Sequence, residues 1–196
     1  MGSFIREGLR IVNEIPIEDM QYIDEIITSK RQEDAFVAIG EGGSGKVYRY
    51  KKYAIKLFHD HAKSDGDPPY PHDGYFLSLL DRSPYFPSVY YYIEKEYMVV
   101  EFVEGQNIFD VEDRTFIKCI GFLREAINHA FSRGLIVSDM IDANIIVNKK
   151  GIPMIVDVGN FYSVSYEYEI DNLVREYFTR YNEKILNSLA ESRQEA

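Results

Sequence analysis

The sequence is poor in the residues that build disulfides and thiolate metal centres. Its 196 residues include one cysteine, Cys119, and no tryptophan. A single cysteine cannot form an internal disulfide or a cysteine-based zinc site, and its scarcity is typical of a reducing compartment. The chain also has no run of about 18 apolar residues, and its N-terminus lacks the apolar stretch of a secretory signal. These absences predict a cytoplasmic protein without a membrane segment.

Basic residues are also scarce. Lysine and arginine together number 22 against 32 acidic residues, which gives a formal net charge of -10. General binding to nucleic acid needs clustered positive charge, so we expect none here, although a local anion site is compatible with this balance. Hydrophobic residues make up 45% of the chain and charged residues 28%. This composition is typical of a globular protein that buries its own core.

The residue pattern changes twice along the chain. Residues 1–34 carry two helical patterns separated by Pro16, and the second has apolar residues every three or four positions over 17–28. We expect that helix to cap the domain that follows, with docking of a partner as the alternative. Residues 35–103 consist of short β-prone runs, which predict an antiparallel sheet of about five strands. Residues 104–196 are mainly helical, so the expected fold class is α+β.

A glycine-rich loop separates the first two β-prone runs. It contains Gly40, Glu41, Gly42, Gly43, Ser44 and Gly45. In a Rossmann fold such a loop would open a helix, whereas here Val47 lies in a β-prone run. Glycines in a strand-turn-strand unit let backbone amides approach phosphates closely. The loop therefore predicts a phosphate site, with a hairpin turn that binds nothing as the alternative.

A lysine follows this loop on the next predicted strand. Lys56 lies nine positions after Val47, among small and apolar neighbours that include Ala54. An ammonium group in that place can hold phosphate oxygens as a point charge. Together with Lys46, it would bring positive charge to the predicted phosphate site.

The second half of the chain carries acidic and amide side chains near two short predicted strands. Asp139 and Asn144 precede one strand, and Asp157 follows the next. Magnesium prefers hard oxygen ligands and needs only one or two from the protein when phosphates and water complete its shell. Asn144 and Asp157 fit this role. Asp139 would then accept the proton of an attacking hydroxyl.

These motifs, in this order, resemble the protein-kinase-like superfamily over residues 35–178. The short chain is similar to the atypical minimal kinases of the Rio type and the small tRNA-modification type, and to bacterial-style serine/threonine kinase-like proteins. The resemblance implies a bilobal fold: an N-terminal helical extension (1–34), an N-lobe with a five-stranded antiparallel sheet (35–103) and a shortened helical C-lobe (104–196). It implies ATP and Mg²⁺ as cofactors, bound between the lobes.

The same resemblance assigns roles to residues. Asp139 and Lys56 would be catalytic, and Asn144 and Asp157 would be metal ligands. The glycine-rich loop would cover the phosphates. Adenine would bond to the backbone of Glu101 and Val103. The apolar walls of the adenine site would be Val47, Ala54 and Ile146.

The chain also departs from the kinase pattern. Val137-Ser138-Asp139 stands where serine, threonine and tyrosine kinases have His-Arg-Asp, and Ile141 stands where they place a lysine. No glutamate is present to pair with Lys56, and Asp73 is the nearest acid on the following helix, one methylene shorter. Few residues follow Asp157, so no peptide groove is implied.

We therefore expect an ATP- and Mg²⁺-dependent enzyme, an atypical serine/threonine protein kinase. It would transfer the γ-phosphate to a protein hydroxyl, its own included. One alternative is a catalytically weak pseudokinase, which would act as a nucleotide-gated module for a regulatory partner. A small-molecule kinase is the second alternative.

Overall fold

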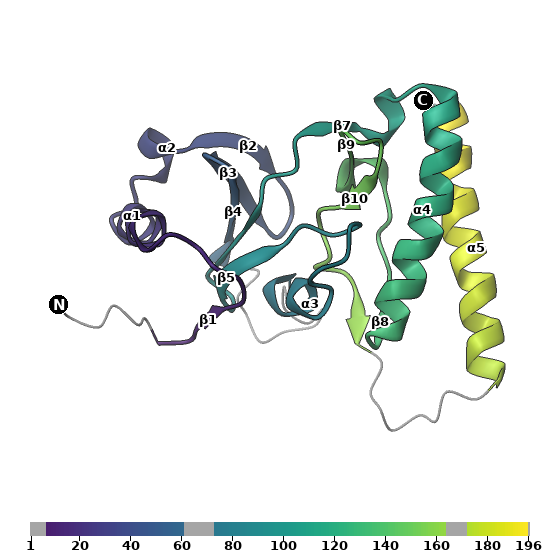
Figure 1. Ribbon diagram of the computed structural model, residues 1–196, viewed down its shortest axis with the longest axis horizontal. Helices are drawn as coiled ribbons and strands as arrows, with labels where there is room; N and C mark the ends of the chain where they lie inside the picture. Colours follow the sequence, from purple (N-terminus) through teal and green to yellow (C-terminus); the bar gives the residue numbers. More distant parts are fainter. Residues whose placement is uncertain (1–6, 61–72, 164–171, 196) are drawn as a thin grey trace. The chain divides into compact units, whose positions relative to one another are not determined.

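The structure is a computed structural model that describes residues 7–60, 73–163 and 172–195. It shows an α+β protein whose sheets are antiparallel throughout the described residues (Figure 1). The chain divides into two compact units. The first contains residues 1–78 and 88–102, and the second contains residues 79–87 and 103–196.

The first unit is built on a six-stranded sheet. From edge to edge its strands are β1 (Leu9–Ile11), β5 (Val89–Ile93), β6 (Tyr97–Glu101), β4 (Tyr53–Phe58), β3 (Gly45–Tyr50) and β2 (Val37–Glu41). The helices are α1 (Ile17–Thr28), α2 (Gln32–Ala35) and α3 (Asp73–Leu79), the last of which ends at the unit boundary. The strands are rich in tyrosine, valine and isoleucine, which favour extended backbone.

The prediction of five strands was wrong by one. The additional strand, β1, lies where a helical pattern was expected, and it pairs with β5 through Leu9 opposite Ile93. Gly8, directly before it, has a φ of 82°, a backbone conformation that a helix does not allow. A strand of three residues is too short to show its own periodicity, so its pairing with a distant strand decides its conformation.

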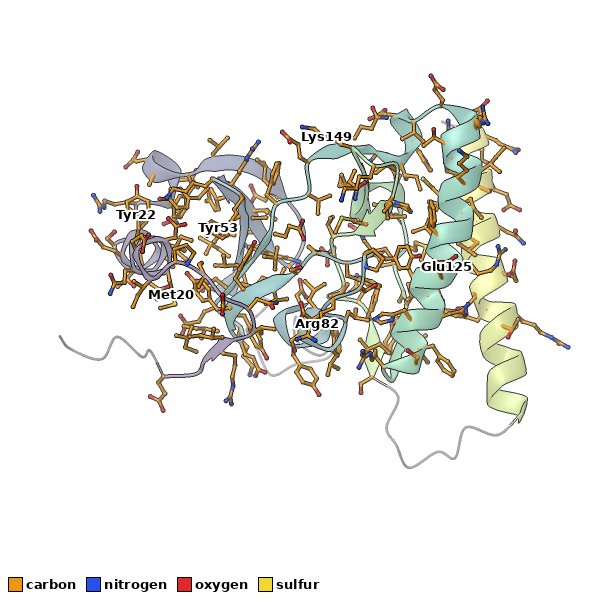
Figure 2. The ribbon with its side chains drawn as sticks, in the orientation of Figure 1. Met20, Tyr22, Tyr53, Arg82, Glu125 and Lys149 are labelled. Atoms are coloured by element: carbon orange, nitrogen blue, oxygen red, sulfur yellow. The ribbon has the colours of Figure 1, made fainter. Side chains whose placement is uncertain are left out.

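Helix α1 covers one face of this sheet, as expected. Ile23 and Ile26 are buried against sheet residues that include Tyr53, Ile55 and Tyr97. Figure 2 shows Tyr53 on the sheet beside the helix that carries Met20 and Tyr22. Ile17, the first residue of the helix, is exposed and does not take part in this apolar contact.

Acidic side chains of the N-terminal segment also bind tyrosine hydroxyls of the sheet. Tyr53 donates to Asp19 at 2.9 Å, Tyr97 donates to Asp24, and Tyr48 donates to Glu33 of α2. Lys51 also bonds to Asp19. The segment is thus joined to the sheet by polar as well as apolar contacts.

The second unit combines two long helices with short strands. Its elements are β7 (Gly105–Asn107), a 3-10 turn η2 (Ile108–Asp110), α4 (Asp113–Ser132), β8 (Leu135–Ile136), a 3-10 turn η3 (Asp142–Asn144), β9 (Ile145–Asn148), β10 (Pro153–Ile155), β11 (Tyr162–Ser163) and α5 (Asn172–Glu195). Strand β9 lies between β10 and β7, and β11 pairs with β8. The loop that carries Asp139 and Asn144 lies between β8 and β9.

Helices α4 and α5 lie side by side (Figure 1). Cys119, Leu123 and Ile127 of α4 are buried. Arg124 of α4 donates two hydrogen bonds to Glu183 of α5, at 2.9 and 3.1 Å. Within the residues that the structure describes, no helix is both long and apolar enough to cross a bilayer.

Candidate functional site

The glycine-rich loop forms the hairpin between β2 and β3. Gly40 pairs with Val47, and the amide of Gly42 donates to the carbonyl of Gly45 at 2.9 Å. The amide of His59 donates to the carbonyl of Ser44 at 3.0 Å, which fixes the second half of the loop to the end of β4. The sequence motif therefore lies on a strand-turn-strand unit, as predicted.

The glycines of this loop lie in two different surroundings. A Cβ atom at Gly45 would lie 2.3 Å from the carbonyl oxygen of Leu57, so only glycine fits between β3 and β4. At Gly40, Gly42 and Gly43 an added Cβ would meet nothing within 4 Å. Packing within the described residues thus explains Gly45, whereas the other three leave open space above the backbone.

Lys56 shares one face of the sheet with two residues predicted to line a nucleotide site. In the β3, β4 and β6 pairing, Val47 lies opposite Lys56, and Ala54 lies opposite Val100. Side chains alternate along a strand, and directly opposite residues point to the same face. Val47, Ala54, Val100 and Lys56 therefore occupy the face opposite α1.

Lys56 has an acidic partner, which the sequence had left open. Its Nζ lies 2.5 Å from Oδ2 of Asp73, the first residue of α3, and the two side chains are only 6% and 0% exposed. An aspartate thus reaches the lysine, although no glutamate is available on this helix. Two opposite charges buried together are held in one arrangement, because separating them would leave each uncompensated.

Lys46 does not share this face. Its ammonium group bonds to Glu33 of α2 at 2.7 Å, and this bond lowers the pKa of Glu33 and raises that of Lys46. Because adjacent strand residues alternate, Lys46 lies on the α1 side while Val47 lies on the Lys56 side. The expectation that Lys46 adds charge to the phosphate site is therefore wrong.

Some backbone amides of the segment predicted to bind adenine already donate hydrogen bonds within the protein. The amide of Glu101 donates to the carbonyl of Ser88 at 2.8 Å, and the amide of Phe102 donates to that of Lys52 at 2.9 Å. The N–H group of Glu101 is therefore not available to an adenine. Val103 and Ile146, also predicted here, belong to the second unit.

In the second unit, Asp139 lies in a loop with an uncommon backbone conformation. Its φ is 56°, in the left-handed region that aspartate enters more readily than most residues. Its carbonyl accepts bonds from the amide of Ile141 at 3.0 Å and from Nδ2 of Asn144 at 2.9 Å. The carboxylate is exposed, as a general base that meets a substrate must be.

A second amide holds the Asp139 carboxylate. Nδ2 of Asn160 donates to its Oδ2 at 2.8 Å, while Nδ2 of Asn144 lies 3.5 Å from the same oxygen. Asn160 lies three residues after Asp157. The predicted base thus bonds to a residue of the same loop as the predicted metal ligand.

The pairing of β9 with β10 also brings the backbone at Asn144 close to the residue before Asp157. The amide of Val156 donates to the carbonyl of Asn144 at 2.9 Å, directly beyond the β9–β10 pair. Oδ1 of Asp157 accepts the amide of Gly159 at 3.0 Å, which fixes the carboxylate. Asn144 uses its amide nitrogen on Asp139, so its oxygen is the atom suited to a cation.

This donor set fits magnesium. In the described residues no three His, Cys, Asp or Glu side chains gather into a metal cage. Mg²⁺ does not need one, because it keeps waters and takes most remaining ligands from phosphates. Such a site needs only one carboxylate and one amide oxygen from the protein.

Buried apolar side chains hold both loops. Val137 and Met140 flank Asp139, and Val158 and Phe161 follow Asp157. The ring of Phe161 packs edge-on against that of Phe86. Val158 is fully buried, so an apolar side chain anchors the loop directly after Asp157.

Two features of the site could not be recognised from the sequence. Asn160 resembles any polar loop residue, and only its position after a strand-end carboxylate hinted at a role. The reach of Asp73 depends on how closely α3 approaches the sheet. No protein-family model matches this chain, and no curated protein matches it significantly either.

Proposed function

We propose that this protein is an ATP- and Mg²⁺-dependent phosphotransferase with a compact, bilobal protein-kinase-like fold. It would transfer the γ-phosphate of ATP to a serine or threonine hydroxyl of a protein, with autophosphorylation as a special case. The observation that carries the proposal is the buried pair of Lys56 and Asp73 beside a glycine hairpin.

The buried pair supports a function because stability alone does not require it. Burying two charges costs desolvation energy, and apolar residues of similar size usually stabilise a core equally well or better. A buried lysine that pairs with a buried carboxylate beside a glycine hairpin is therefore a candidate functional site. Lys56 would bind the phosphates, and the open space at Gly42 and Gly43 leaves room for them beside the glycine hairpin.

The second unit supplies the groups for the transfer itself. Asp139 would accept the proton of the acceptor hydroxyl, and Asn160 and Asn144 would hold its carboxylate in one orientation. Mg²⁺, held by Asn144 and Asp157, would neutralise charge on the phosphates.

The pseudokinase alternative is less well supported. One of its two grounds, the short C-terminal region being the other, is that Lys56 lacks a glutamate partner, and the contact with Asp73 supplies an acidic partner instead. No observation in the described residues favours a small-molecule acceptor over a protein.

The test measures transfer of labelled γ-phosphate from ATP to the protein itself and to a pool of protein substrates. We expect transfer that requires Mg²⁺, and we expect Asp157→Asn to lose it because the carboxylate ligand is gone. Glu104→Gln, which removes an exposed acid paired with Lys149, is a matched control and should transfer normally. Absence of transfer by the wild type with every substrate pool would refute the proposal.

A further inference from the structure

Helix α3 begins with an acid that is shorter than a glutamate, and yet its carboxylate reaches Lys56. The Asp73 side chain is fully buried, and its Oδ2 lies 2.5 Å from the lysine Nζ. A shorter side chain can make this contact only if the helix backbone lies correspondingly closer to the sheet. The next residue of the helix shows how that approach is achieved.

Gly74 packs directly on Tyr92 of β5. A Cβ atom added at Gly74 would lie 2.5 Å from Cγ of Tyr92 and 2.8 Å from its Cβ. Carbon atoms in ordinary contact are about 3.5 to 4.0 Å apart, so any other residue would move α3 away from the sheet by roughly 1 Å. Gly74 is buried in α3 and has no positive φ, so the glycine is needed for space rather than for its backbone conformation.

Tyr92 and Lys56 belong to one row across the sheet. Tyr92 pairs with Met98, and Met98 pairs with Lys56. Opposite residues point to the same face, and neighbouring strands lie about 4.8 Å apart, so these two positions lie about 10 Å apart on that face. The first two residues of α3 thus contact the two ends of the row, Asp73 at Lys56 and Gly74 at Tyr92.

The hydroxyl of Tyr92 makes a second contact with the helix. Burial raises the pKa of Tyr92, and a hydrogen bond with Ser78 lowers it. Ser78 follows Gly74 by four positions, so both lie on one side of α3, about one turn apart. The tyrosine therefore lies along the helix, with its ring at Gly74 and its hydroxyl towards Ser78.

We propose that Gly74 and Tyr92 are positioning residues that hold α3 at the distance at which an aspartate, rather than a glutamate, pairs with Lys56. The proposal rests on the proposed function in one respect, namely that the paired lysine binds the phosphates of ATP. According to the proposal, the distance between α3 and the sheet is matched to the length of the acidic side chain at position 73. A larger residue at position 74 then requires a longer acid at position 73, and the longer acid requires the larger residue.

The test compares wild type with Gly74→Ala, Asp73→Glu and the double variant. Two quantities are measured in the full chain: the rate of γ-phosphate transfer, and the NMR signal of the Lys56 ammonium in protein labelled with ¹⁵N-lysine. That signal is visible when a buried ion pair slows proton exchange, and Lys56→Arg assigns it. Tyr92→Phe, which keeps the ring and loses the bond to Ser78, measures the contribution of the hydroxyl.

We expect each single variant to transfer phosphate about 10- to 100-fold more slowly, because a shift of about 1 Å at such a site has effects of this size. The double variant should recover to within a few-fold of wild type, and its lysine signal should return. If the two substitutions caused independent packing defects, their effects on the transfer rate would instead add up. A double variant slower than both singles would therefore overturn the proposal, as would a Gly74→Ala protein with wild-type signal and rate.

Two further outcomes keep the test decisive. If Gly74→Ala does not fold, Asp73→Glu alone still tests the matched spacing, and full activity in that variant overturns it. If wild type transfers no phosphate, the proposed function fails, whereas the loss and return of the lysine signal across the variants still decides the positioning roles.

Discussion

At the scale of single residues, Asp139 combines an exposed carboxylate with a backbone that is costly to hold. A left-handed φ costs a non-glycine residue about 1 to 2 kcal/mol, and here the loop is fixed by two bonds to the Asp139 carbonyl. Such strain is concentrated at functional sites, where the surrounding structure over-determines one geometry. The carboxylate is held as well, by the amide of Asn160 at 2.8 Å.

Asn160→Ala tests whether this amide orients the base. We expect kcat to fall about 10-fold and KM for ATP to stay unchanged, because the bond acts on the carboxylate that receives the proton. Asn160→Asp should be slower still, since it puts a second carboxylate beside the first. Steady-state kinetics measure both constants.

Asn128→Ala, at an exposed position of α4, is the control and should behave as wild type. A normal kcat in Asn160→Ala would contradict the orienting role, and so would a loss expressed only in KM for ATP.

At the scale of elements, the glycine hairpin contains two kinds of glycine position. Gly45 permits the close pairing of β3 with β4, whereas Gly42 and Gly43 face open space. A motif that served only to make a turn would not need glycines where side chains fit. Substitutions at the two kinds of position should therefore have different consequences.

Gly45→Ala should destabilise the protein by about 1 to 3 kcal/mol, because its Cβ would overlap the Leu57 carbonyl. Gly42→Ala should leave the melting temperature nearly unchanged and weaken ATP binding, since the methyl group occupies the proposed phosphate space. Thermal unfolding with and without ATP and Mg²⁺ measures both effects. Equal ATP affinity in Gly42→Ala and wild type would favour a hairpin that binds nothing.

Helix α1 supplies a pH-dependent contribution to stability. The hydrogen bond from Lys51 lowers the pKa of Asp19 below 3.8, although burial opposes this, and the bond from Tyr53 lowers it further. A carboxylate whose folded-state pKa is lowered stabilises the fold above its unfolded pKa. That contribution is lost as the pH falls through the folded-state value.

Asp19→Asn should therefore lower the free energy of unfolding near neutral pH by about 1 to 2 kcal/mol. The difference from wild type should shrink as the pH falls below about 4. Urea unfolding at a series of pH values measures it. Glu25→Gln removes an exposed acid of the same helix and should stay within about 0.5 kcal/mol of wild type. A constant deficit in Asp19→Asn across the acid range would contradict the charge-based account.

Local patterns predicted most of these elements but not their distant contacts. The apolar spacing over 17–28 predicted α1, and the β-prone runs predicted five strands, because both depend on neighbours in sequence. Strand β1 depends on pairing with residues about 80 positions away. The bond between Lys56 and Asp73 depends on the room that Gly74 leaves. The local periodicity of the sequence cannot predict either the pairing of β1 or the bond between Lys56 and Asp73.

At the scale of the whole molecule, acidity and phosphate binding are compatible. The net charge of -10 leads us to expect no general binding to nucleic acid. A nucleotide site requires less, because glycine amides, one lysine and a metal ion can balance a triphosphate locally. The first unit carries the lysine and the hairpin, and the second carries the proposed base and metal ligands.

The central claim is that these residues perform phosphate transfer, and Asp139→Asn tests it most directly. The amide keeps the shape of the side chain and loses its ability to accept a proton. We predict that γ-phosphate transfer falls by about 10²- to 10⁴-fold while the thermal shift with ATP and Mg²⁺ matches that of wild type. Transfer at the wild-type rate by Asp139→Asn, measured in the same assay, would contradict the account.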